Sequence, residues 1–556
     1  MKRYMMHLIK GAEVRTEHFL KFQEKDPESI QYGGIKGDIW EAKPTVYALA
    51  TAISVYLNEK SVFYHDKKLY DAVSLALDFV RRTQREDGSF DLPSCNFKSA
   101  ADTSFCFKRL ILAYGILRRY GKPSGEIKAL EEKYLVLMHD ALKAIAAGGF
   151  HTPNHRWAIA ASLLQGADLF ASETDFAKLL KSRAEQYLAE GIDGDEDGQY
   201  AERSTGNYNA VVNNAMIAMF EETGDEKFLG YVRRNLEMML TYMDPDDTIF
   251  TQDSTRQDKG KVEHGDKYFY QYLYMCSREE NEHFDGAAHK LIRDNMERGE
   301  LAPDCLSVVM NHEEMMDHEF IHYGFLKEYR KFFEPSGVLR VKKKKYTYTV
   351  LNGKSSFLFF KTGNAMVYFK IGESYCDIRN FIPQQIHVTD TGCELSGTAE
   401  GWYYLPFKTP PETSDWWNMD QTKREKLISS KLKINLAIKE LEDGLELSLR
   451  AEGLDRLPLR LEVCLPAGAV LENEHFHLKA AAGEGMILKD GYIHVYANEQ
   501  ALVLGPGFGT HTFQGHYSGE ELNGAGYTVY CNEYTPLEKN FTILNPAPVQ
   551  ADDLPC

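Results

Sequence analysis

The segment GGFHTPNHRWAIAASL, residues 148–163, places four large polar or aromatic side chains where an apolar helix begins. Asn154, His155, Arg156 and Trp157 follow one another there without a break. Asparagine, histidine and arginine can donate hydrogen bonds to a carboxylate, and histidine can also move a proton. The run therefore indicates either a helix cap or one part of a site for an anionic ligand, depending on which residues lie beside it.

An internal repeat indicates which residues those are. Aromatic residues that follow polar turns recur at Phe90, Phe150, Tyr200 and Phe250, at intervals of 60, 50 and 50 residues. A small polar residue stands four positions after each of them, at Ser94, Asn154, Ser204 and Ser254. Each interval has room for one helical hairpin. Repeated hairpins can close into a toroid, which would bring the equivalent loops together on one rim around a common cavity.

The residues that follow the repeat aromatics are the candidate site residues. They are rich in hydrogen-bond donors and positive charge, which favours an anionic, hydroxyl-rich ligand such as a uronic acid. The candidates for catalysis are Asn154, His155, Tyr208 and His264. The candidates for substrate binding are Asn96, Arg156, Trp157, Glu202, Arg203, Arg256, Gln257 and Asp258.

A uronic acid permits one reaction that these residue types fit. Removing the weakly acidic C5 proton while expelling the group on C4 breaks the glycosidic bond without water. Asn154 and His155 would neutralise the sugar carboxylate by donating hydrogen bonds to it. Tyr208 would remove the C5 proton and protonate the leaving oxygen when both atoms lie on one face of the sugar. Nearby arginine and protonated histidine would lower the pKa of this tyrosine.

These motifs resemble the polysaccharide lyases of the heparinase II/III and alginate-lyase type. The Asn154–His155 pair and the turn DGQYAE, which contains Glu202 and precedes Tyr208, carry the resemblance. The resemblance implies an (α/α) toroid, incomplete or with six hairpins, followed by an antiparallel β-sandwich. It also implies that Tyr208 is the acid and, for syn elimination, the base, with Asn154 and His155 on the carboxylate.

The chain departs from this family pattern in two places. Pro153 stands where many members have a second asparagine. Many members also draw a further histidine from the β domain, and His264 in the last helical loop is the substitute candidate for the base. Similarity to lyases that act on rhamnosyl-α-1,4-glucuronate implies an exo-acting, cytoplasmic enzyme for imported acidic oligosaccharides.

The periodicity of apolar residues changes once along the chain. Up to about Phe333 apolar residues recur every three or four positions, which is typical of helices. After Pro335 short alternating segments separated by N-G and T-G turns are typical of antiparallel strands. We therefore expect a helical toroid over residues 1–334 and an antiparallel β-sandwich over residues 335–556.

Composition excludes several classes of protein. A net charge of −18 argues against nucleic-acid binding, and no apolar stretch reaches the roughly 20 residues of a membrane helix. The nine cysteines are scattered without zinc spacing, so we expect reduced thiols and a cytoplasmic location. We expect no cofactor and no metal; the helical offsets of His312, His318 and His322 favour a solvated helix face. Homo-oligomerisation stays open.

Two other functions stay open at this point. A glycoside hydrolase on the same toroid, inverting or specific for unsaturated uronyl groups, would need a pair of carboxylates across the scissile bond. Asp102, Glu202 and Asp258 are the carboxylates available in the same loops. A non-catalytic carbohydrate-binding protein would also explain the aromatic residues.

Overall fold

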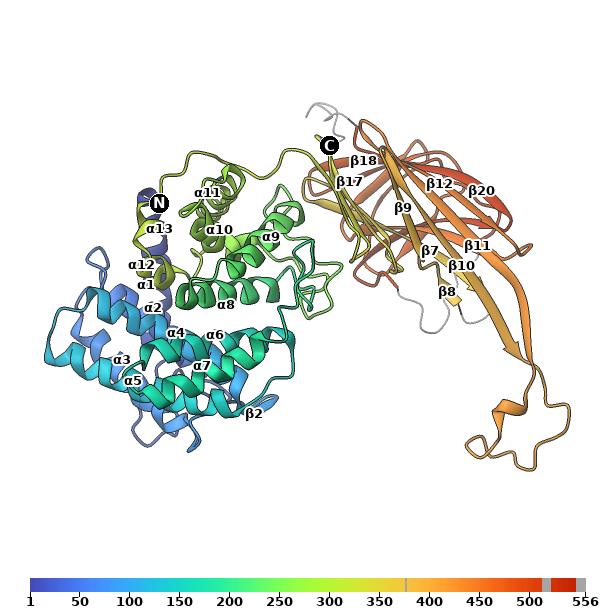
Figure 1. Cartoon of the computed structure of the whole chain (residues 1–556). Helices are drawn as coiled ribbons and strands as arrows, with labels where there is room; N and C mark the ends of the chain where they lie inside the picture. Colours follow the sequence, from blue (N-terminus) through green and yellow to red (C-terminus); the bar gives the residue numbers. More distant parts are fainter. Residues whose placement is uncertain (376–377, 513–521, 547–556) are drawn as a thin grey trace. The chain divides into compact units, whose positions relative to one another are not determined.

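The chain divides into two compact units, Met1–Leu326 and Lys327–Cys556 (Figure 1). The structure, a computed structural model, describes residues 1–375, 378–512 and 522–546. The expected order of a helical part followed by an antiparallel β part is confirmed. The second unit starts ahead of the 334/335 boundary expected from the sequence, because strand β3 (Tyr329–Phe333) pairs with strand β4 (Val338–Lys342).

The first unit is built from helices that alternate with short loops. Its long helices are α1 (Lys2–Phe22), α2 (Lys43–Tyr56), α3 (Lys67–Thr83), α4 (Ala100–Tyr120), α5 (Gly125–Ala147), α6 (Pro153–Leu169), α7 (Thr174–Leu188), α8 (Tyr208–Thr223), α9 (Lys227–Tyr242), α10 (Phe269–Cys276) and α11 (Glu282–Glu297). Its short elements are β1 (Phe90–Leu92), β2 (Asn96–Ser99), the 3-10 turn η1 (Gly265–Tyr268), α12 (Leu306–Asn311) and α13 (Glu313–Asp317).

The even-numbered helices form the inner layer of this unit. Helices α2, α4, α6 and α8 pack against one another in order, and each also packs against an odd-numbered neighbour. Helix α2 buries residues around its whole circumference, whereas α3 buries a single stripe. A helix that is apolar all round is typically central, and one with a single apolar stripe lies outside. This is the arrangement of an (α/α) toroid.

The repeat aromatics lie in equivalent loops of the toroid. Phe90, Phe150, Tyr200 and Phe250 each fall between an odd-numbered helix and the next even-numbered one. Phe90, Tyr200 and Phe250 are buried, and Phe150 alone of the four is exposed, at 42%. In three of the loops the buried aromatic ring therefore packs the loop against the helices. The loop ahead of α6 lacks this packing because Phe150 is exposed.

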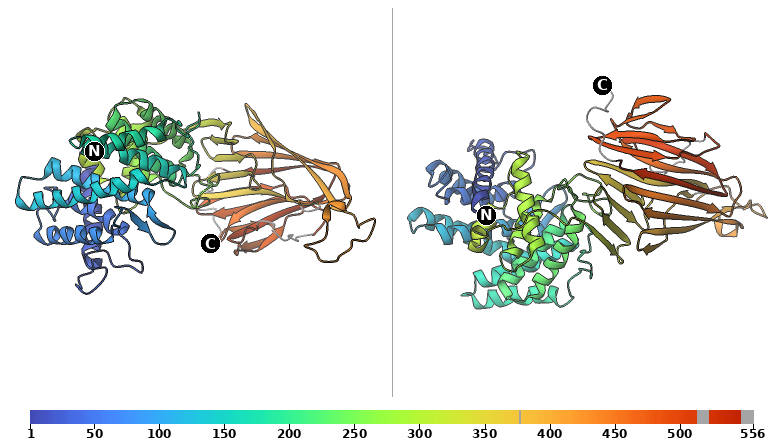
Figure 2. Two further views of the ribbon diagram at one scale, coloured as in Figure 1. Left: turned by 60° about the horizontal axis from the view of Figure 1, so that its bottom comes forward. Right: turned by 90° about the horizontal axis from the view of Figure 1, so that it is seen from above.

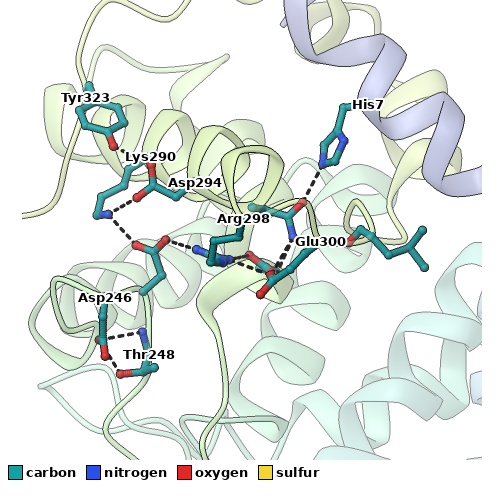
Figure 3. Close-up of polar contacts among 12 residues, drawn as sticks. His7, Asp246, Thr248, Lys290, Asp294, Arg298, Glu300 and Tyr323 are labelled. Carbon is teal, nitrogen blue, oxygen red and sulfur yellow. Dashed lines mark hydrogen bonds and ion pairs between the residues drawn. The ribbon is translucent and has the colours of Figure 1, made fainter. Parts of the chain in front are cut away.

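Helix α1 packs on α11, α12 and α13, which joins the start of the unit to its end. A polar network lies at this junction (Figure 3). The buried carboxylate of Asp247 pairs with Lys290 Nζ at 2.8 Å and with Arg298 Nη1 at 2.6 Å. His7 Nε2 of α1 contacts Asn295 Oδ1 of α11 at 2.7 Å, and Asn295 Nδ2 donates to Asp266 Oδ2 at 3.0 Å. The network thus ties α1, α11 and η1 together.

The second unit consists of two sheets. Its strands after β3 and β4 are β5 (Thr347–Leu351), β6 (Leu358–Thr362), β7 (Ala365–Tyr375), β8 (Ile378–Asn380), β9 (Gln385–Thr389), β10 (Gly392–Tyr404), β11 (Lys426–Glu440), β12 (Gly444–Glu452), β13 (Pro458–Pro466), β14 (Val470–Asn473), β15 (Phe476–Lys479), β16 (Gly485–Ile487), β17 (Ile493–Ala497), β18 (Gln500–Gly505), β19 (Gly526–Tyr534) and β20 (Leu537–Leu544). One sheet has the order β15-β14-β17-β18-β20-β12-β11-β10-β9, and the other β16-β19-β13-β7-β6-β5-β4-β3, with β8 beside β7.

The two sheets share one apolar core, which makes the unit a β-sandwich (Figure 2). Phe369 of β7 and Phe541 of β20, from different sheets, have ring centroids 6.2 Å apart within it. Among the strand pairs that the structure describes, the pairing of β16 with β19 is parallel and the others are antiparallel. The predicted antiparallel sandwich is therefore confirmed, with that one parallel pair added.

No helix in the described ranges is both long enough and apolar enough to cross a membrane.

The network around Asp247 gives a first prediction. The substitution Asp247→Asn leaves Lys290 and Arg298 without their shared buried counter-charge, so we expect it to lower the free energy of unfolding of the helical unit by about 3 kcal/mol. Asp317→Asn, which removes an exposed pair with Lys2, should change it by less than about 0.5 kcal/mol. Urea unfolding followed by circular dichroism measures both, and equal effects would contradict this account of the junction.

Candidate active site

The N-terminal ends of the inner helices lie on one rim. Lys43 of α2 donates to Asp102 Oδ1 of α4 at 3.0 Å. The ring of His155 in α6 lies 5.7 Å from that of Phe105 in α4. Lys267 of η1 donates to the carbonyl of Gly206, just ahead of α8. Because helix N-termini carry partial positive charge, a rim built from several of them favours an anionic ligand.

The buried carboxylate of Glu202 connects the loops of this rim. Its Oε2 accepts from the backbone N–H of Asn154 at 3.0 Å and from Nδ2 of Asn154 at 2.7 Å. Its Oε1 lies 3.4 Å from Arg256 Nε, and its backbone carbonyl accepts from Thr255 Oγ1 at 2.7 Å. Glu202 therefore fixes the loops ahead of α6, α8 and α10 relative to one another.

This arrangement occupies both amide hydrogens of Asn154. Its Nδ2 donates to Glu202 and, at 3.2 Å, to Thr152 Oγ1, which uses the two donors of an asparagine amide. The remaining Oδ1 is buried without a partner and can only accept. Asn154 thus positions Glu202 and has no free donor for a ligand carboxylate, unlike the role expected from the sequence.

Asp258 holds the turn from which α8 starts. It accepts hydrogen bonds from Ser204 Oγ at 2.9 Å, Ser254 Oγ at 2.7 Å and the backbone N–H of Gly206 at 2.9 Å. Ser204 Oγ in turn accepts from the backbone N–H of Tyr208 at 3.0 Å. The small polar residues of the repeat therefore anchor a carboxylate, and Asp258 is a structural group with 4% exposure and not a ligand contact.

The structure brings Tyr208, Arg256 and Gln257 together. The guanidinium carbon of Arg256 lies 5.0 Å from the centre of the Tyr208 ring. The phenol of Tyr208 donates to Gln257 Oε1 at 3.3 Å from a half-exposed position in the first turn of α8. The hydroxyl is thus accessible, and both a fixed cation and a helix N-terminus lie beside it.

His155 is close to this group but is uncharged at neutral pH. Burial, followed by the neighbouring His151, lowers the pKa of His155 to about 4. The expectation of a protonated histidine near Tyr208 is therefore wrong for His155, and the cation over the Tyr208 ring is Arg256. His155 Nδ1 is buried without a partner, so the neutral ring keeps one nitrogen free to donate or accept.

Two residues of the opening run face away from the site. Trp157 is fully buried, and its Nε1 donates to Asp193 Oδ1 at 2.5 Å. Its ring has no surface for a sugar, so the expected substrate contact is wrong. Arg156 donates to the carbonyls of Tyr187 at 2.5 Å and Gly191 at 2.9 Å, which fixes the end of α7 in place of a ligand.

The other candidates occupy different positions. Asn96 Nδ2 donates to Asp102 Oδ2 at 3.2 Å and so supports the start of α4. Arg203 is half-buried in the turn ahead of α8, with a φ of 44°. His264 lines a cavity of about 490 Å³ between inner helices, and its Nδ1 has no partner.

The cavity also contains residues that the sequence analysis missed. Lys108 and Arg109 of α4 and Tyr270 of α10 line it. So do Asn214 of α8 and Asn207, the residue just before α8. The sequence held one signal for them, the Lys-Arg pair inside the apolar stretch FCFKRLIL. Charged side chains are costly within a buried helix, so such a pair indicates a polar cavity or a ligand beside the helix.

The three histidines considered for a metal do not converge on one point. His312 Nε2 lies 2.6 Å from Glu221 Oε1, whereas His318 Nε2 lies 2.7 Å from Asp285 Oδ1. His318 and His322 follow the end of α13, so the expected helix face is wrong. Cys276, Asp285 and His318 offer ligand atoms within 4.8 Å of one another. Asp285 also accepts two backbone N–H groups, from Ile321 at 3.0 Å and from His322 at 2.6 Å, so the cluster fastens this segment to α11.

The carboxylates considered for hydrolysis are all engaged. Asp102 accepts from Lys43, from Asn96 and, at 2.8 Å, from Ser99 Oγ. Burial raises the pKa of Asp102, but Lys43 and these hydrogen bonds outweigh burial and leave the pKa below its ordinary value. With Glu202 and Asp258 bound as described, all three carboxylates are buried and held by protein groups, and none is an accessible general acid.

Comparison with known proteins gives a match in structure alone. No family model and no curated protein matches the chain. A xanthan lyase from Paenibacillus is similar, with a TM-score of 0.58 and 9% identity over 99% of this chain and 58% of that one. A heparinase III is also similar, with a TM-score of 0.57 and 11% identity over 98% of this chain and 86% of that one. The chondroitin AC lyase of Streptomyces coelicolor A3, solved with chondroitin sulphate, has a TM-score of 0.54 and 11% identity over 99% of this chain and 80% of that one. The chain spans 58% of the length of that xanthan lyase, and it shares the fold of all three.

The neutral state of His155 predicts a pH dependence of stability. Its pKa of about 4 lies below the ordinary value of about 6.5, so the native state favours the neutral ring. The resulting stability is fully present above pH 6.5 and is lost as the pH falls toward 4. The wild type should therefore lose more stability than His155→Gln between pH 7 and pH 4.5 in urea unfolding. A constant difference between the two proteins would show that His155 titrates normally.

Proposed function

We propose that the chain is a carbon–oxygen lyase that cleaves a glycosidic bond to a uronic acid by β-elimination. The observation that carries the proposal is the accessible phenol of Tyr208 beneath the guanidinium of Arg256, on a rim of helix N-termini. The fold shared with a xanthan lyase, a heparinase III and a chondroitin AC lyase supports it. The substrate would be an acidic, glucuronate-type oligosaccharide, attacked from one end in the cytoplasm.

In this mechanism Tyr208 performs both proton transfers. In its deprotonated form the oxygen of Tyr208 takes the proton from C5 of the uronic acid, with the guanidinium of Arg256 over the ring. The electrons of the C5–H bond form the C4–C5 double bond, the C4–O4 bond breaks, and the phenol returns the proton to O4. No water is consumed. The neutral ring of His155 would hydrogen-bond to the substrate, and His264 is the candidate for a separate base if the two atoms lie on opposite faces.

The hydrolase alternative is less well supported. An inverting enzyme needs one protonated carboxyl group and one carboxylate that activates water, with a gap between them for the water. Asp102, Glu202 and Asp258 each accept several hydrogen bonds or pair with a cation, so all three hold protein groups in place. A non-catalytic sugar-binding protein could also use Arg256 and Tyr208, and the fold shared with three lyases favours catalysis.

The substitution Tyr208→Phe tests the proposal. It removes the only atom that moves the proton and keeps the ring under Arg256, so we expect kcat to fall by about 10²- to 10⁴-fold with little change in KM. The assay is the ultraviolet absorbance of the new C4–C5 double bond, measured on a panel of glycans that contain glucuronate, galacturonate and rhamnose. Tyr231→Phe on the outer helix α9 is the matched control and should leave kcat unchanged.

Three outcomes distinguish the candidate functions. Bond cleavage without new ultraviolet absorbance would indicate hydrolysis. Binding of an acidic glycan without cleavage, unaffected by Tyr208→Phe, would indicate a binding protein. Elimination that survives Tyr208→Phe would show that another residue moves the proton and would contradict the assignment of Tyr208.

A further inference from the structure

Helices α4 and α8 both contribute to the wall of the cavity of about 490 Å³. On α8, Val211 lines the cavity one turn after Tyr208, and residues three apart share a helix face. On α4, Lys108 lines the cavity one turn after Phe105, whose ring contacts His155. Residues of the cavity wall therefore lie one helical turn from Tyr208 on α8 and one turn from the contact with His155 on α4.

The charged groups around the cavity are nearly all paired with protein groups. The other basic residues on its wall are Arg15, Arg109, His264 and Lys267, and the acidic ones are Glu263, Asp266 and Asp304. Arg109 pairs with Asp304 at 3.5 Å, and Lys267 pairs with Glu263 at 3.3 Å. Arg15 donates to the carbonyl of Ala302 at 2.6 Å. Asp266 pairs with Arg298 at 3.6 Å.

Among the lysines and arginines of this wall, Lys108 alone has no protein partner in the described part of the chain. Its ammonium group makes no hydrogen bond or ion pair with any residue in the described part of the chain, although the side chain is half-buried. Burial, followed by the charge of Arg109, lowers the pKa of Lys108 to about 7. A cation in such a place is costly unless an anion compensates it, and no carboxylate among the described residues pairs with Lys108.

A second donor faces the same space from α8. The Oδ1 of Asn214 accepts from the hydroxyl of Tyr270 and, at 2.7 Å, from Nε2 of Gln271. These two donors fix the orientation of the amide and leave its NH₂ group without a protein partner among the described residues. Lys108 and Asn214 thus contribute free donors to one cavity from opposing inner helices.

We propose that this cavity is an anion-binding subsite in which the ammonium of Lys108 and the amide of Asn214 bind the carboxylate of a uronic acid. This inference rests on the proposed function and deepens it. The role of neutralising the carboxylate passes to Lys108, because Asn154 has both its hydrogens bound within the protein. An ammonium paired with a carboxylate makes a stronger, charge-assisted hydrogen bond than a neutral amide.

Binding measurements with the full chain test the subsite without any turnover. We expect isothermal titration calorimetry to detect glucuronate but to give much weaker binding for glucuronamide, which lacks the charge. Lys108→Met should reduce the affinity for glucuronate by about 10- to 100-fold, as the loss of a charged hydrogen bond predicts, and Lys108→Arg should retain most of it. The control Lys98→Met removes an exposed lysine of the β2 loop and should have no effect.

Thermal unfolding without ligand gives an independent readout. Since Lys108 has no protein partner, Lys108→Met should unfold at the same or a higher temperature than the wild type. A clear loss of stability would show that Lys108 has a structural partner and would overturn the proposal. Equal affinity of Lys108→Met and wild type for glucuronate, or of glucuronate and glucuronamide for the wild type, would also overturn it.

The two proposals can fail separately. If no glycan undergoes elimination but glucuronate binding depends on Lys108, the subsite stands and the lyase activity does not. If elimination depends on Tyr208 while Lys108→Met leaves both KM and kcat unchanged, the lyase stands and the subsite does not.

Discussion

The buried carboxylate of Glu202 is the interaction on which the candidate site depends. A carboxylate with 5% exposure must be paired, and Glu202 meets this need with Asn154 on one side and Arg256 on the other. Both partners come from other loops of the repeat. The requirement to satisfy one buried charge thus sets the relative positions of three loops, and it places Arg256 over the ring of Tyr208.

The pairing of acidic groups within the protein also explains how an acidic protein can bind an acidic ligand. The chain has a net charge of −18, yet the acidic groups of the rim and cavity are paired or hydrogen-bonded within the protein. Among the described residues, what remains unpaired at this place is positive: the helix N-termini and the ammonium of Lys108. Local field and net charge are separate quantities, and the local field acts on a ligand inside a cavity.

Much of the fold could be predicted from periodicity. The recurrence of Phe90, Phe150, Tyr200 and Phe250 locates the loops between the helical hairpins. Three of these four rings are buried and hold their loops against the helices. The change to alternating residues near Pro335 predicts the sandwich, and only the boundary shifts, since β3 begins at Tyr329. The single parallel pair of strands has no local sequence signal.

The site was less predictable, because contiguity in sequence is not proximity in space. Successive residues of a helix point about 100° apart, so Asn154 contacts Glu202 while Arg156, two residues later, contacts the end of α7. The side-chain amide of Asn154 donates a hydrogen bond to Glu202, which is distant in sequence. A single sequence does not reveal such a pair. Lys108 was missed because it lies in an apolar helix and belongs to no motif. Its proposed role follows only from its position on the cavity wall.

The central claim is that the bond breaks by elimination and not by addition of water, and isotopic labelling tests it most directly. A glucuronate-containing oligosaccharide is digested in H₂¹⁸O, and the products are weighed by mass spectrometry. The account predicts that the product masses add up to the mass of the substrate and that no product carries ¹⁸O from the cleavage. One ¹⁸O atom per broken bond, with products heavier than the substrate by one water, would contradict it.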